Sequence, residues 1–202
     1  MVDIATTTGR IYGMVVDPEK TLAHNSQPVP PWQLVAKEHA LPLIVATALL
    51  HTVLIWLLQP LYAVIADSAG ATLPEAVNPI MTIIVRMVTQ FVGLIVWALV
   101  IGFFAGILGG RNDFNAAYVL VALALTPYVV AGSLTPIPVF GTILWLCGLV
   151  YALVIIYRGV PILVGVPEEN RAKHLVLSII AMVMAGMLVT LVLKSFLAGA
   201  TA

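Results

Sequence analysis

The distribution of charge along the chain is the feature that most limits its fold. Asp, Glu, Lys and Arg make up 9% of the 202 residues, and they leave four uncharged stretches at 39–66, 87–110, 114–157 and 174–193. A helix needs about 20 consecutive apolar residues to cross the hydrocarbon core of a bilayer. Three of the stretches therefore fit one span each, and the stretch from 114 to 157 is long enough for two.

A proline-rich turn divides the longest stretch. Thr135, Pro136, Ile137 and Pro138 lie in its middle, and two prolines so close together cannot both continue a helix. The runs are also too long and too continuous for the alternating strands of a membrane barrel. The sequence therefore predicts an all-α integral membrane protein, a five-transmembrane-helix bundle with a kink at Pro127. The expected domains are an N-terminal segment at 1–40 and a membrane domain at 41–198, with spans at about 41–66, 82–108, 114–134, 139–158 and 174–198.

Composition excludes several classes of protein. Apolar residues make up 61% of the chain and the formal net charge is zero, whereas a soluble domain averages roughly 45–50% apolar residues. An ordinary soluble enzyme, a disordered chain and a nucleic-acid-binding protein are therefore disfavoured. The single cysteine, the dispersed histidines and the lack of HExxH, GxSxG, GxGxxG or P-loop motifs predict no enzymatic activity, no metal and no cofactor.

The positive-inside rule predicts the orientation. In the five-span arrangement, seven Lys and Arg residues lie on the side of the N-terminus and two, Arg86 and Lys194, lie on the other side. This asymmetry favours a cytoplasmic N-terminus and an external C-terminus. No signal peptide is visible at the start. The N-terminal segment is interpreted as a short helix that caps the bundle or lies in the membrane interface through Ile11, Tyr12, Val15 and Val16.

Small residues form a stripe along the second predicted span. Ala98, Gly102, Gly106 and Gly110 recur at intervals of four, and such a stripe allows another helix to approach closely. We favour packing within the bundle, and a homo-oligomer seam is the alternative.

Three polar residues fall at membrane depth. His51 lies near the middle of the first predicted span, and Arg86 and Gln90 share a face in the outer part of the second. Ionisable residues within a membrane are functional candidates because their desolvation must be compensated. Two interpretations remain for each. His51 either relays protons or binds a metal, or it hydrogen-bonds between helices. Arg86 either lines a polar crevice, or it reaches the headgroups or pairs with Asp67 or Glu75.

A resemblance to a known family rests on the residues before the last span. The stretch from Gly141 to Lys173 reads GTILWLCGLVYALVIIYRGVPILVGVPEENRAK, and it resembles the closing signature of the Yip family of Ypt/Rab-interacting integral membrane proteins. The matching positions are Tyr151, Tyr157, Gly159, Pro161, Pro167, Glu168, Glu169, Arg171 and Lys173. Thr126-Pro127, the turn at 137–141 and the segment Val16–Thr21 are also similar. Leu22 and Asn170 depart from the family pattern.

The resemblance covers about 10–198 and implies five membrane helices with a cytoplasmic N-terminus. The short N-terminal segment is similar to prokaryotic members, which implies the bacterial cytoplasmic (inner) membrane and leaves the Rab role without a counterpart. In this reading Gly159 and Pro161 end the fourth span, and Pro167, Glu168 and Glu169 precede the last one. The loop from Gly159 to Lys173 is either purely structural or a cytoplasmic docking face for a protein or for lipid headgroups.

The sequence leaves three functional hypotheses to compare. The first is a non-enzymatic scaffold or adaptor in membrane organisation, with the bilayer and cytoplasmic proteins as partners and no nucleic acid. The second is a small transporter or channel subunit with a polar path near His51, Arg86 and Gln90, although no inverted repeat is visible. An intramembrane enzyme ranks lowest, since no pairing of a nucleophile with a base is visible.

Overall fold

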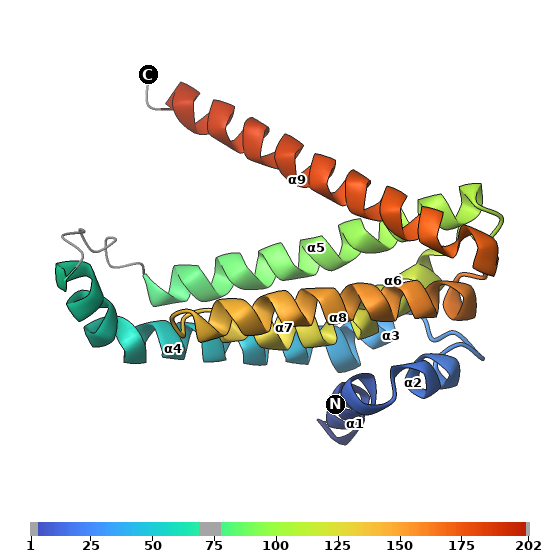
Figure 1. Ribbon diagram of the computed structural model, residues 1–202, viewed down its shortest axis with the longest axis horizontal. Helices are drawn as coiled ribbons and strands as arrows, with labels where there is room; N and C mark the ends of the chain where they lie inside the picture. Colours follow the sequence, from blue (N-terminus) through green and yellow to red (C-terminus); the bar gives the residue numbers. More distant parts are fainter. Residues whose placement is uncertain (1–3, 69–77, 201–202) are drawn as a thin grey trace.

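The structure, a computed structural model, describes residues 4–68 and 78–200, with side chains described for 7–68 and 78–187. The described residues are helical and contain no strand, which confirms the all-α prediction. The helices, labelled in Figure 1, are α1 (Ile4–Val16), α2 (Pro18–His24), α3 (Trp32–Val35), α4 (Leu41–Ser68), α5 (Pro79–Ile107), α6 (Phe114–Ala124), α7 (Thr126–Ser133), α8 (Phe140–Leu163) and α9 (Arg171–Ala200). A π-helical turn at Ala36–Ala40 joins α3 to α4, and a 3-10 turn at Glu168–Asn170 precedes α9.

Three helical segments of the described chain are long and apolar enough to cross a membrane. They are Trp32–Ser68, Pro79–Ile107 and Phe140–Leu163, and the pair α6 and α7 makes a fourth if the two count as one bent span. The five-span count and the orientation therefore stay predictions, because the side chains of α9 beyond Met187 lie outside the described residues. The kink expected at Pro127 is confirmed, since α6 and α7 meet at 40° around Leu125.

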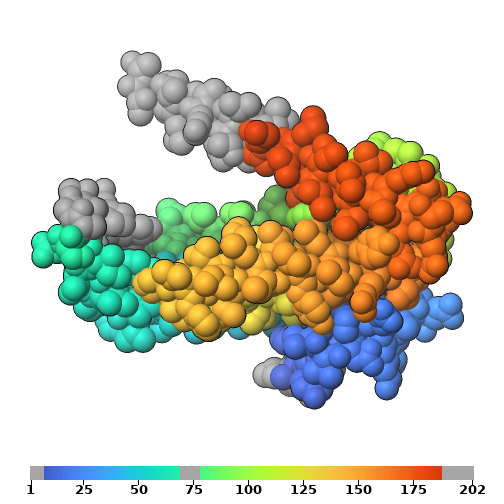
Figure 2. All heavy atoms as spheres, viewed as in Figure 1, coloured from blue at the N-terminus to red at the C-terminus, as the bar shows by residue number. Residues whose placement is uncertain are grey.

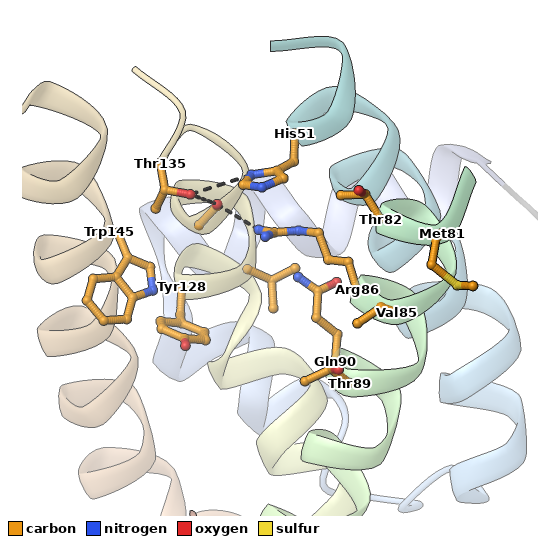
Figure 3. Close-up of a pocket in the computed structure, with 12 residues that line it drawn as sticks. His51, Met81, Thr82, Val85, Arg86, Thr89, Gln90, Tyr128, Thr135 and Trp145 are labelled. Carbon is orange, nitrogen blue, oxygen red and sulfur yellow. Dashed lines mark hydrogen bonds between the residues drawn. The ribbon is translucent and has the colours of Figure 1, made fainter. Parts of the chain in front are cut away.

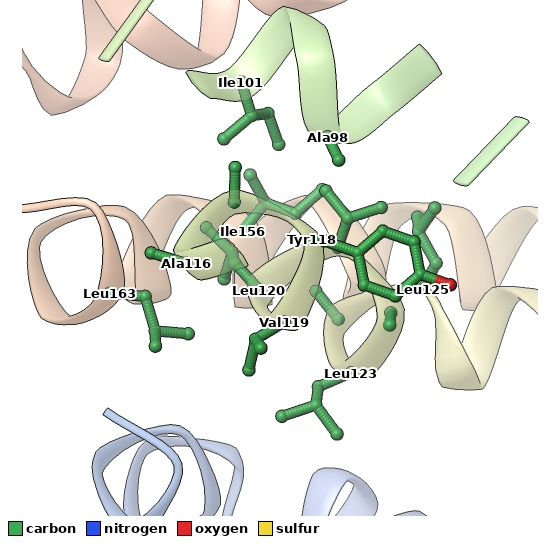
Figure 4. Packing of buried hydrophobic residues seen from close by; sticks show 14 of the residues in the cluster. Ala98, Ile101, Ala116, Tyr118, Val119, Leu120, Leu123, Leu125, Ile156 and Leu163 are labelled. Atoms are coloured by element: carbon green, nitrogen blue, oxygen red, sulfur yellow. The ribbon is translucent and has the colours of Figure 1, made fainter. Parts of the chain in front are cut away.

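Helix α6 lies at the centre of the bundle. Every residue from Ala116 to Ala124 is buried, and α6 packs against α5 and α8. Figure 4 shows Tyr118 and Leu120 of α6 among other buried apolar side chains, with Ile101 of α5 and Ile156 of α8 nearby. By contrast, large apolar side chains such as Trp56, Val88 and Val150 are exposed on the outer faces of α4, α5 and α8. A short helix can be apolar on all sides only when other helices surround it, whereas outer apolar faces suit contact with lipid.

Helix α9 has a different relation to the bundle. It packs against α5 and α8, and Figure 1 shows it diverging from α5 toward its C-terminal end. The small-residue stripe of α5 faces other elements of the same chain. A Cβ atom on Gly102 would lie 3.5 Å from the Cβ of Ala117 in α6, and one on Gly106 would lie 3.0 Å from the Cβ of Asn112. Ala98 is fully buried, and Gly110 lies against the carbonyl of Val164.

Helix α8 extends beyond its expected end. We expected Gly159 and Pro161 to terminate this span near residue 158, but α8 continues through both to Leu163. Membrane helices tolerate an internal proline where neighbouring groups satisfy the backbone that it frees. Pro60 is likewise internal to α4. The correction moves Gly159 and Pro161 out of the loop, which shortens to Val164–Pro167 before the 3-10 turn.

The N-terminal helices pack on the outside of the bundle. Asp17 caps α2 by accepting a hydrogen bond from the backbone N–H of Lys20 at 3.2 Å, with Pro18 at the first helical position. Helix α2 contacts α8, and Figure 2 shows the N-terminal segment in blue against α8 in orange. Tyr12, Val15 and Val16 remain exposed on α1, so its placement in the membrane interface stays a prediction.

Candidate functional site

A crevice that contains the polar side chains of His51, Arg86 and Gln90 lies among helices α4, α5, α7 and α8. It encloses about 640 Å³. The lining residues come from four helices and the turn after α7, and they are His51, Met81, Thr82, Val85, Arg86, Thr89, Gln90, Tyr128, Val129, Gly132, Thr135 and Trp145. The structure therefore brings together all three polar residues predicted at membrane depth (Figure 3).

Arg86 is the charged group of this crevice. Its Nη2 atom donates a hydrogen bond of 2.7 Å to the carbonyl of Gly132 at the end of α7. A Cβ atom on Gly132 would make ordinary van der Waals contacts, at 3.5 Å from Nη2 and 3.4 Å from Cδ1 of Trp145. Nδ1 of His51 in α4 lies 3.5 Å from the hydroxyl of Thr135, which in turn donates to the Gly132 carbonyl at 2.9 Å. One carbonyl thus links Arg86 to the His51 side of the crevice.

The charge of Arg86 has no carboxylate partner in the part of the chain that the structure describes. The suggested partner Asp67 forms no ion pair there, and Glu75 lies outside the described residues. Two further atoms of the crevice, Nε of Arg86 and Oε1 of Gln90, are buried without a hydrogen-bond partner in the same part of the chain. Buried polar groups are normally satisfied, so this crevice holds unused hydrogen-bonding capacity.

Apolar packing closes the inner end of the crevice. Gln90 is the last residue of α5 that lines it, and the next residues on the same helical face, Leu94 and Ala98, are buried. Tyr118 and Leu120 of α6 fill the bundle at this level with no exposed surface. The crevice is therefore a blind pocket in one copy of the chain.

A second group of polar contacts clasps the loops at the other end of the bundle, which we call the Arg111 end. The backbone N–H of Arg111 donates to the carbonyl of Val164 at 2.8 Å, and its Nη2 donates to the carbonyl of Leu163 at 2.9 Å. Nδ2 of Asn170 donates to the carbonyl of Leu108 at 3.1 Å. Two glycines allow the tight turns, since Gly109 has φ +87° and Gly165 has φ +68°. The two loops are therefore tied together through their backbones.

The predicted docking residues divide into two groups at this end. Glu169 and Lys173 are exposed, whereas Arg171 pairs with Glu168 at 2.7 Å and lies 5.0 Å from the ring centroid of Tyr157. Pro167 caps the 3-10 turn. Gly159 is buried inside the bundle instead. A Cβ atom on it would lie 2.8 Å from Cδ1 of Leu22 in α2, so it holds the N-terminal helices and offers no docking surface.

Sequence reasoning missed several lining residues of the crevice. Tyr128, Gly132, Thr135 and Trp145 come from the kinked third segment and from α8. They are ordinary membrane-helix residues in sequence, and only the packing of α7 against α8 and α4 places them around Arg86. Among the described residues, no group of three or more His, Cys, Asp or Glu side chains is placed to hold a metal ion.

Comparison with known proteins identifies one family. A family model described as the Yip1 domain matches residues 26–191. No curated protein and no solved structure gives a match.

Proposed function

This chain belongs to the Yip1 domain family of membrane proteins, and on that premise we propose that it is a non-enzymatic scaffold or adaptor in membrane organisation. Its Arg111 end faces the cytoplasm together with the N-terminus, and the C-terminus is external. Seven Lys and Arg residues on that side, against two on the other, support this orientation.

The observation that carries the proposal is the clasp at the Arg111 end. The Arg111 backbone N–H and the Asn170 side chain tie two loops together by donating to the carbonyls of Val164 and Leu108, while Glu169 and Lys173 are exposed. A preorganised, charged surface loses little conformational entropy when a partner docks.

Charge reversal at Glu169 tests the docking face. We attach a photo-activated cross-linker to Lys173→Cys in a Cys147→Ser background, so that position 173 carries the only cysteine. The labelled protein is then reconstituted into native membranes. We expect a discrete protein adduct, and we expect Glu169→Lys to reduce its yield about fivefold because attraction becomes repulsion at an exposed position. Glu168→Lys is the less clean variant, since it also removes the ion pair with Arg171.

The matched control places the same cross-linker at Val150→Cys, which is exposed on the outer face of α8. It should yield lipid adducts and no discrete protein band. A yield at Lys173→Cys that Glu169→Lys leaves unchanged, or an equal protein band from Val150→Cys, would contradict docking at this face.

The alternative function is a small transporter or channel subunit. The crevice favours it, because His51, Arg86 and Gln90 line one cavity. Buried Leu94 and Ala98 at its inner end weigh against a path through one copy, so an oligomer would have to supply the route. Proton or ion flux into sealed vesicles that His51→Ala abolishes would support this function. Flux equal to that of empty vesicles would contradict the transporter or channel function.

A further inference from the structure

The uncompensated charge of Arg86 is the starting point. A fixed positive charge within a membrane helix is expensive, and such residues usually pair with another group. The Gly132 carbonyl satisfies one Nη atom at 2.7 Å. A carbonyl carries no net charge, and the buried Nε has no partner in the described part of the chain. Within the described part of the chain, hydrogen bonding to Arg86 is therefore incomplete and its charge is not neutralised.

The surrounding groups favour anionic oxygen. The hydroxyl of Thr89 and the indole of Trp145 line the same cavity, and each can donate a hydrogen bond. The hydroxyls of Thr82 and Thr135 also line it, but they already donate to the carbonyls of Asn78 and Gly132. A guanidinium offers several donors in a planar fork that matches the geometry of phosphate oxygens. We propose that the crevice around Arg86 binds a phosphate group, supplied by the headgroup of an anionic lipid. This inference does not rest on the adaptor function.

The position of the crevice favours a lipid as the source. Arg86 lies seven residues into α5 from Pro79, or about 10 Å along the helix axis, which is a depth that a headgroup can reach by local deformation of the bilayer. Val85 is an exposed apolar side chain in the α5 wall of the crevice, and Leu146 and Val150 are exposed on α8, the helix that forms the wall at Trp145. Acyl chains can lie along these walls while the phosphate meets Arg86. Figure 3 shows Arg86 and Trp145 on opposite walls, with Tyr128 between them.

Lipid titration with native mass spectrometry tests the proposal. The purified full-length chain in detergent is titrated with phosphatidylglycerol, phosphatidylcholine and, separately, inorganic phosphate. We expect phosphatidylglycerol to bind at least tenfold more tightly than phosphatidylcholine, and Arg86→Gln to weaken it by at least tenfold because a charge-assisted bond is lost. Arg86→Lys should recover part of the affinity. The matched control is Arg158→Gln, which removes an exposed arginine far from the crevice and should leave binding unchanged.

A second variant tests the proposal if Arg86→Gln does not fold. Thr89 is exposed at the crevice, so Thr89→Phe narrows the cavity while Arg86 stays in place, and we expect it to weaken phosphatidylglycerol at least fivefold. Phosphate binding that depends on Arg86, without lipid binding, would support the phosphate site and assign it to the free anion. Lipid affinity equal in wild type, Arg86→Gln and Thr89→Phe, or binding of neither probe, would overturn the proposal.

Discussion

Replacing Gly148 with leucine is expected to destabilise the bundle by about 3 kcal/mol, at the upper end of the cost of overpacking. A Cβ atom on Gly148 would lie 2.9 Å from the Pro127 carbonyl oxygen and 3.2 Å from Cα of Tyr128. These atoms are backbone, so they cannot turn away as a side chain would. Helices α7 and α8 must therefore separate. Close approach of helices replaces the missing hydrophobic driving force in a bilayer, which makes this contact costly to lose.

Reversible unfolding in mixed detergent and dodecyl sulfate micelles measures the effect. The matched control is Gly93→Ala in α5, where a Cβ atom would meet nothing within 4 Å. That control should be neutral or slightly stabilising, because alanine favours helix over glycine. An unfolding midpoint for Gly148→Leu equal to that of Gly93→Ala would show that α7 and α8 do not depend on their close contact.

The sequence was sufficient for the helical class because the membrane imposes a strong constraint on backbone hydrogen bonding. Uncharged runs located α4, α5 and α8, and the rule that proline breaks helices located the bend near Pro127. The same rule failed at Pro161, which remains inside α8. A proline frees and crowds the carbonyl of the preceding turn, and whether neighbouring groups stabilise that turn depends on tertiary packing, which is not visible in a sequence.

The residues of the candidate site could be predicted from the sequence, but the contacts between them could not. Depth along two predicted spans singled out His51, Arg86 and Gln90, and the structure places them in one cavity. Periodicity could not reveal that the Gly132 carbonyl would be the partner of Arg86. That contact requires α7 to end opposite Arg86, and the end point depends on the bend between α6 and α7.

Gly159 shows both what the sequence predicted and what it missed. The family signature drew attention to this residue, and the structure places it inside α8 instead of at the end of the helix. It lies on α8 where Leu120 of α6 and Leu22 of α2 converge, and all three residues are buried. The absence of a side chain there lets α2 sit directly on the bundle. A residue of a recognition signature can thus be selected for holding an N-terminal segment in place.

Replacing Gly159 with leucine is therefore expected to release α1 and α2 while the membrane helices stay folded. The added side chain must displace Leu22, whose Cδ1 would lie 2.8 Å from the new Cβ, and it must also turn aside the end of the Leu120 side chain of α6, which lies closer still. Overpacking of this kind costs about 1–3 kcal/mol. Two exposed contacts also hold the segment, the ion pair of Arg158 with Glu19 at 3.1 Å and the bond from the Tyr151 hydroxyl to the Val15 carbonyl at 3.0 Å. The exposed pair is worth at most about 1 kcal/mol, so it cannot offset the loss.

Hydrogen exchange of the amides in α2 measures the release. We expect their protection to fall about tenfold or more in Gly159→Leu, since each 1.4 kcal/mol is a factor of about ten in the opening equilibrium. Arg158→Gln is the matched control on the same helix, and it should lower protection by less than about fivefold. If Arg158→Gln released α2 as fully as Gly159→Leu, surface charge would hold the N-terminal helices. Equal loss of protection in α2 and in the centre of α8 would instead mean that Gly159→Leu unfolds the whole bundle. Release confined to α1 and α2 is the outcome that follows from Leu22 seated on Gly159.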